Sequence, residues 1–119
     1  MCVTGFMIAQ GTVRKSHRFS TARAFLLPFQ NRTNLHVSKN SRVLKILIDP
    51  KTKQTTGVMY EKNGRIFKVG VNKEVVLSAG TKMSPHLLML SGIGPADHLQ
   101  EMGIKVLSDL PVGQNLQVN

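Results

Sequence analysis

Residues 75–94 contain the pattern that most directly suggests ligand chemistry in this chain of 119 residues. A continuous apolar run, Val75–Leu77, leads into Ala79-Gly80, and a helix is predicted to follow, with Ser84 as its N-cap and Pro85 as its first residue. Continuous apolar runs are typical of strands covered on both faces, and ligands gather where such strands lead into helices. Glycine lets a flat cofactor approach the backbone, and a helix N-terminus favours phosphate or an anionic ring. By itself, the same pattern also suits ordinary packing of a strand against a helix.

Other residues that could carry chemistry are few. Cys2 is the single cysteine, so it can form no internal disulfide and cannot hold a zinc ion by itself. The sequence therefore predicts no metal site. Imidazole titrates near neutral pH, which makes each histidine a candidate general base. The four histidines are His17, His36, His86 and His98.

Strand patterns dominate the middle of the chain. A three-stranded antiparallel meander is predicted over Val43–Ile48, Val58–Glu61 and Ile66–Val71, because the first segment is β-branched and alternating and turn residues separate the three. Asn63-Gly64 tolerates the positive φ angles of a two-residue hairpin turn. A further short strand is predicted over Asn34–Val37.

Helix signals flank these strands. A helix of about two turns is predicted within Ser20–Pro28, with Phe25 and Leu26 facing inward and Pro28 ending it. After the helix that begins at Ser84, a second one is predicted over Pro95–Met102, with Gly103 closing it in the left-handed conformation. The tail from residue 110 onward is rich in turn residues and is predicted to be irregular. Without repeats or long linkers, the sequence predicts one folding unit of mixed α/β class.

The charge is strongly uneven. The formal net charge is +10, and residues 1–60 carry ten Lys or Arg against one acid, Asp49. Such a field could bind nucleic acid, but the few aromatic residues and the scattered cations argue against it. One alternative is a face of a larger, acidic assembly. No apolar run is long enough to span a bilayer, and no signal peptide is recognisable. Localisation stays open, and would be extracellular if a parent protein is secreted.

The segment Gly80–Gly94 also resembles a signature of the glucose-methanol-choline (GMC) oxidoreductases, which oxidise alcohols and sugars with FAD. Ten positions fit that signature: Gly80, Thr81, Ser84, Pro85, Leu87, Leu88, Ser91, Gly92, Ile93 and Gly94. Further segments are similar to the family, especially to its insect glucose dehydrogenase-like branch: Gln10–Arg14, Arg18–Leu26, Asn34–Val37, Val43–Ile48 and Pro111–Gln117. The resemblance covers nearly the whole chain.

This resemblance implies that residues 1–119 are the central part of a doubly wound FAD-binding domain, with the meander and two short helices. It implies FAD as the cofactor and an alcohol or sugar as the substrate of the full-length relative. Val43 would contact the adenine through its main chain, and Ala79 and Gly80 would pass close to the dinucleotide. The alternative interpretation of Val43 is an ordinary core valine.

The same resemblance limits what this chain can do. The family's Gly-x-Gly-x-x-Gly turn, which seats the pyrophosphate, is absent from the sequence. No histidine matches the family's catalytic base, so we predict no catalytic residue and expect the chain alone to be inactive and to bind FAD weakly or not at all. The alternative function is a non-catalytic basic module that binds an acidic partner. Oligomeric state and electron acceptor are not predicted.

Overall fold

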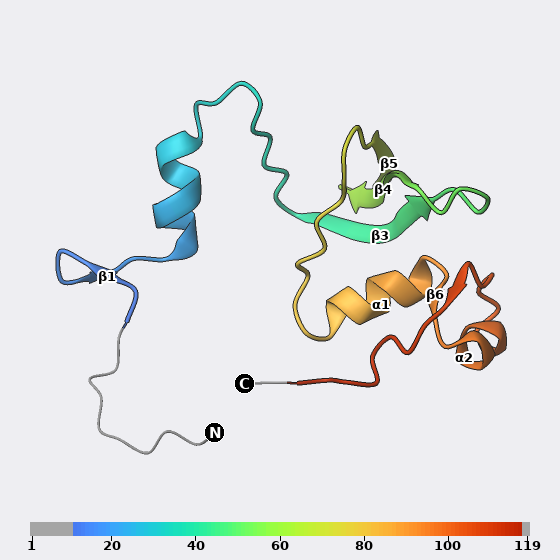
Figure 1. The fold of residues 1–119 in the computed structure, drawn as a ribbon. Coiled ribbons are helices and arrows are strands. Elements are labelled where there is room, and N and C mark those ends of the chain that lie inside the picture. Colours follow the sequence, from blue (N-terminus) through green and yellow to red (C-terminus); the bar gives the residue numbers. More distant parts are fainter. Residues whose placement is uncertain (1–10, 118–119) are drawn as a thin grey trace, which may run out of the picture. The chain divides into compact units, whose positions relative to one another are not determined.

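The chain forms two compact units, which divide after Ser38. A computed structural model describes residues 11–117 (Figure 1). The sequence predicted a single unit instead. The division falls where the backbone is irregular, since residues 30–40 form neither helix nor strand.

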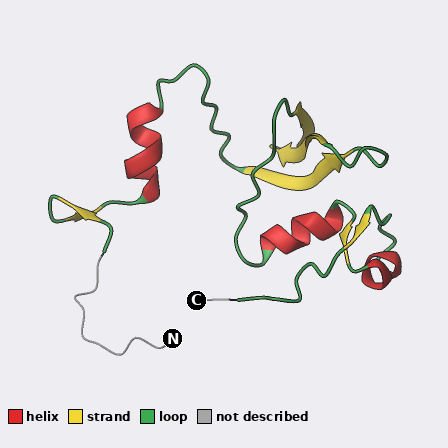
Figure 2. Cartoon of the chain, in the orientation of Figure 1, coloured by secondary structure: helices red, strands yellow, loops and turns green. Residues whose placement is uncertain are grey.

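The first unit contains a small hairpin followed by a short helical segment (Figure 2). Strands β1, Val13–Arg14, and β2, His17–Arg18, pair in antiparallel fashion. The predicted helix is present as a π-helical turn, η1, Ala22–Leu26, which continues through Pro28 as a 3-10 turn, η2, Leu27–Phe29. The backbone therefore stays helical past the proline that was predicted to end it.

Two further predictions for this unit were wrong. Phe25 and Leu26 do not face a core, because they are 70% and 41% exposed and no side chain of residues 11–38 is buried. Asn34–Val37 forms no strand. A short apolar segment needs a neighbouring strand to hold it extended, and no strand within residues 11–117 pairs with it.

The second unit is built on the predicted meander, which is confirmed. Strands β3, Ser41–Ile48, β4, Thr55–Lys62, and β5, Arg65–Gly70, form an antiparallel sheet in the order β3-β4-β5. Asn63 and Gly64 have φ angles of 52° and 72°, as their hairpin turn requires.

A tight turn between β3 and β4 is organised by Asp49. Its carboxylate accepts hydrogen bonds from the backbone N–H groups of Thr52, at 2.7 Å, and Lys51, at 2.8 Å. These bonds favour the charged form and hold the pKa of Asp49 below its ordinary value of 3.8.

Because the pKa of Asp49 is lowered in the folded state, the stability that this turn contributes depends on pH. The stabilisation is fully present above the ordinary pKa of 3.8 and is lost as the pH falls through the lower folded value. We expect Asp49→Asn to be less stable than wild type at pH 7, and the difference to shrink as the pH is lowered below 3.8. Thermal unfolding followed by circular dichroism between neutral and strongly acidic pH measures this difference. A constant difference across that range would contradict the assignment.

Helix α1, Met83–Leu90, packs against β3 to make the main core of the second unit (Figure 1). Ile46 and Leu87 are buried at this contact. The buried Ser91 hydroxyl joins the two elements, since it donates to the Leu87 carbonyl at 2.6 Å and accepts from the Ile46 N–H at 2.9 Å. A satisfied hydroxyl in such a place stabilises the contact, whereas an unpaired one would be costly.

The C-terminal part forms a second, smaller layer. Strand β6, Ile93–Gly94, pairs in parallel with β7, Ser108–Asp109, and helix α2, Ala96–Glu101, lies between them in the sequence. Both helices after the sheet were predicted, and α2 ends as expected, with Gly103 at a φ of 68°. The N-terminus of α2 is capped from a distance, because the Ala96 N–H donates to Asp109 Oδ1 at 3.0 Å.

One central expectation was wrong for this chain. Val75–Leu77 forms no strand, and Val76 is 77% exposed. A continuous apolar strand is stable only where neighbouring strands and helices cover it. The described residues offer it no neighbouring strand, so the segment crosses from β5 to α1 as irregular backbone.

Candidate functional site

The turn before α1 is held by two hydrogen bonds. The Ala79 N–H donates to Ser84 Oγ at 3.1 Å, and the Ser84 N–H donates to the Gly80 carbonyl at 3.0 Å. Ser84 was predicted as the helix N-cap, which was wrong: α1 starts one residue earlier, at Met83, and Lys82 precedes it without a side-chain cap. The serine hydroxyl reaches backward and fixes Ala79-Gly80 against the first turn of α1.

Gly80 is exposed and has a backbone conformation that only glycine adopts easily. Its φ is 91°, and a Cβ placed on it would meet no atom within 4 Å. Among residues 11–117, the glycine is therefore not needed to relieve a contact. The open space leaves the backbone accessible to a flat group from outside.

A pocket of about 420 Å³ begins directly after this turn. Its walls come from the start of α1 and from the tail after β7, where Gly113 has a φ of 86°. The pocket carries hydroxyl and amide groups beside apolar surface, and no ionisable side chain lines it. The lining residues are Thr81, Ser84, Pro85, Leu88, Val112, Gly113, Asn115, Leu116 and Gln117.

The tail was predicted only as irregular backbone, which is confirmed for residues 110–117. Its role as a pocket wall was missed by reasoning from local patterns. The approach of Gly113 to Pro85, where an added Cβ would lie at an ordinary contact distance of 3.9 Å, depends on tertiary packing and left no local signal.

The third predicted cofactor residue, Val43, lies on a different element from the turn. It is in β3 opposite Tyr60 and is partly exposed, and the register shifts by one residue between Val43 and Lys45. Tyr60 in turn stacks on Phe67 of β5 with ring centroids 5.5 Å apart. The structure thus joins Ala79 and Gly80 at one turn and places Val43 on the sheet.

The histidines take no part in this pocket. His17 is in the first unit, where its Nδ1 lies 2.7 Å from the Lys15 carbonyl oxygen, and none of the four lines the pocket at Thr81. Within residues 11–117, no group of three His, Cys, Asp or Glu side chains is placed to hold a metal ion. None of the helices described combines the length and apolar character needed to cross a membrane.

Comparison with known proteins places this geometry in context. The family model described as GMC oxidoreductase matches residues 2–119. Glucose dehydrogenase (FAD, quinone) of Drosophila melanogaster is 52% identical over 115 residues, which cover 95% of this chain and 18% of that protein. Oxygen-dependent choline dehydrogenase of Sinorhizobium medicae is 47% identical over 114 residues, covering 95% of this chain and 20% of that protein.

A solved structure shows the same fold. The crystal structure of a formate oxidase matches with a TM-score of 0.65 and 31% identity, covering 67% of this chain and 14% of that one. The mixed α/β class predicted from the sequence is confirmed by this match and by the three-stranded sheet with its short helices. The chain spans about a fifth of the length of the curated relatives it matches.

Proposed function

Because this chain belongs to the GMC oxidoreductase family, we propose that residues 1–119 form the central part of an FAD-binding domain and supply part of the surface on which FAD lies. The observation that carries the proposal is the exposed turn at Gly80, where the backbone has a positive φ and an added Cβ would meet no described atom within 4 Å. Curated relatives whose names state FAD dependence support it.

The proposed roles of the three residues differ. Ala79 and Gly80 would lie against the dinucleotide through their backbone, since the Ser84 hydroxyl already takes the Ala79 N–H and holds the turn in place. Val43 would contact the adenine through its main chain, as the family resemblance implies. Rigid backbone at these positions would orient the cofactor without any charged side chain.

The proposed reaction of the whole protein is oxidation of a CH–OH group of an alcohol or sugar. FAD, when bound, supplies the hydride-accepting ring for such a reaction. This chain would bind and orient the cofactor, and its sequence offers no matching catalytic base and no Gly-x-Gly-x-x-Gly turn. We therefore propose that this chain alone is inactive and that both missing parts belong to polypeptide outside this sequence.

A titration with FAD tests the proposal. We expect no stoichiometric yellow complex at micromolar concentration. At millimolar FAD, we expect the backbone amide signals of Val43, Ala79 and Gly80 to shift in nuclear magnetic resonance spectra. Weak binding is expected because only part of the cofactor surface is present, so little of the cofactor would be buried.

The matched variants are Gly80→Val and Gly64→Val. Both glycines have a positive φ and open space around the missing Cβ, so the backbone strain introduced is similar. Only Gly80→Val should abolish the FAD-induced shifts. Shifts confined to other parts of the chain, or equal losses in both variants, would overturn the assignment of the site. A stoichiometric micromolar complex would overturn the expectation of weak binding.

A further inference from the structure

The first unit presents a surface on which every charged side chain is positive. Five basic or imidazole side chains on the β1–β2 hairpin and the start of η1 are exposed, and we call them the basic cluster. The sequence contains no Asp or Glu before Asp49, so this unit has no carboxylate of its own to neutralise them. The basic cluster consists of Arg14, Lys15, His17, Arg18 and Arg23.

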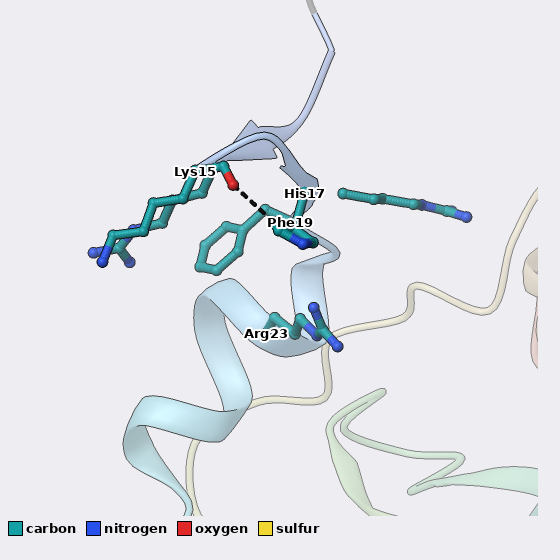
Figure 3. Close-up of a pocket in the computed structure, with 6 residues that line it drawn as sticks. Lys15, His17, Phe19 and Arg23 are labelled. Carbon is teal, nitrogen blue, oxygen red and sulfur yellow. Dashed lines mark hydrogen bonds between the residues drawn. The ribbon is translucent and has the colours of Figure 1, made fainter.

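The cluster surrounds Phe19 and forms an open pocket of about 320 Å³ (Figure 3). The side chains of Lys15 and Arg23 extend away from one another on this surface. These two charges therefore do not converge on one point, which suits a partner with several separated negative groups better than one phosphate.

Phe19 also lines an apolar pocket of about 470 Å³. Val13 and Phe25, both largely exposed, and Ala24 form part of its lining. Because Phe19 lines both pockets, positive charge and an uncovered apolar surface adjoin each other within the same unit. A partner that fills both would carry acidic groups next to an apolar side chain.

We propose that this surface binds an acidic polypeptide segment, with carboxylates on the basic cluster and an aromatic or aliphatic side chain in the pocket beside Phe19. Arginine pairs with carboxylates through two parallel hydrogen bonds, which gives both affinity and orientation. Single-stranded nucleic acid stacks its bases on open aromatic rings, and the ring inside the basic cluster is not open. The Arg14 guanidinium lies 5.3 Å from the Phe19 ring centroid and covers one of its faces.

The full 119-residue chain can be tested against two labelled probes, poly-glutamate and a glutamate–tyrosine copolymer, by fluorescence anisotropy at about 150 mM salt. Neutralising the cluster should weaken binding of both probes about tenfold or more, because several exposed charge pairs are lost together. The cluster variant carries Arg14→Gln, Lys15→Gln, Arg18→Gln and Arg23→Gln.

A control variant removes the same amount of charge from the second unit. Both variants lower the formal charge from +10 to +6, so a simple effect of net charge would weaken binding equally in both. We expect less than a twofold loss in the control, and an equal loss would overturn the proposal. The control carries Lys51→Gln, Lys68→Gln, Lys73→Gln and Lys105→Gln.

Phe25→Ala tests the apolar half and leaves every charge in place. We expect it to weaken binding of the glutamate–tyrosine copolymer about threefold, as one exposed apolar contact is lost, and to leave poly-glutamate unaffected. If the cluster variant loses its circular dichroism signal and is therefore unfolded, Phe25→Ala still tests whether the copolymer binds at this surface. Tighter binding of oligothymidylate or of phosphatidylserine vesicles than of the copolymer, at the same salt, would overturn the choice of partner.

Discussion

Replacing Leu99 by alanine is expected to destabilise the second unit by about 3 kcal/mol, because the side chain is fully buried and its loss leaves a cavity. Leu99 anchors α2 beneath β6, where a Cβ added at Gly94 would lie 3.6 Å from its Cδ1. Urea unfolding followed by far-ultraviolet circular dichroism measures the change. For a chain of this size, such a loss is a large part of the total stability.

Met102→Ala is the matched control for that experiment. Met102 directly follows α2 but is 61% exposed, so removing its side chain should change the free energy of unfolding by less than about 0.5 kcal/mol. Equal unfolding midpoints for Leu99→Ala and wild type would show that α2 does not pack as described.

Gly92→Ala is expected to be at least as damaging, about 3 kcal/mol or more, because strain and collision act together. Gly92 has a φ of 91°, and a Cβ there would lie 2.6 Å from the Lys105 carbonyl oxygen. The Gly92 carbonyl also accepts the Leu107 N–H at 2.7 Å, so any shift to relieve the collision disturbs the β6–β7 pairing. The same urea unfolding experiment measures the loss.

Gly103→Ala separates the two causes. Gly103 also has a positive φ, 68°, but a Cβ added there meets no atom within 4 Å. We expect this substitution to cost only about 1 kcal/mol, the backbone strain alone. If the two alanine variants unfold at the same urea concentration, the contact with Lys105 contributes nothing and the packing around Gly92 is looser than described.

Sequence patterns were most reliable where the deciding interactions are local. The meander was predicted because alternating strands and the Asn63-Gly64 turn are encoded within a few residues of each other, and the strands then pair as neighbours. The end of α2 was predicted for the same reason, since Gly103 follows the helix directly.

Predictions failed where the deciding interaction is distant or absent. The apolar run Val75–Leu77 encodes a covered strand, but the described chain supplies no strand to pair with it. Phe25 was predicted to be buried on the basis of helical spacing, which says nothing about whether another surface lies opposite. Ser84 looked like a helix cap from its neighbours, yet its hydroxyl accepts from Ala79, five residues earlier.

The candidate site was only partly accessible from the sequence. Ala79 and Gly80 could be selected from their position between an apolar run and a helix, whereas the choice of Val43 rested on the family resemblance. The tail that lines the pocket lies about thirty residues after the start of α1 in the sequence. Such a contact depends on tertiary packing, which residue spacing alone does not reveal.

The capping of α2 by Asp109 has a consequence for synthesis on the ribosome. A helix of six residues is too short to be stable by itself, and its cap comes from a residue translated 13 positions later. While the nascent chain emerges, α2 therefore lacks this bond until Asp109 has left the exit tunnel. The hydrogen bonds of the C-terminal part are therefore complete only after both α2 and Asp109 have emerged.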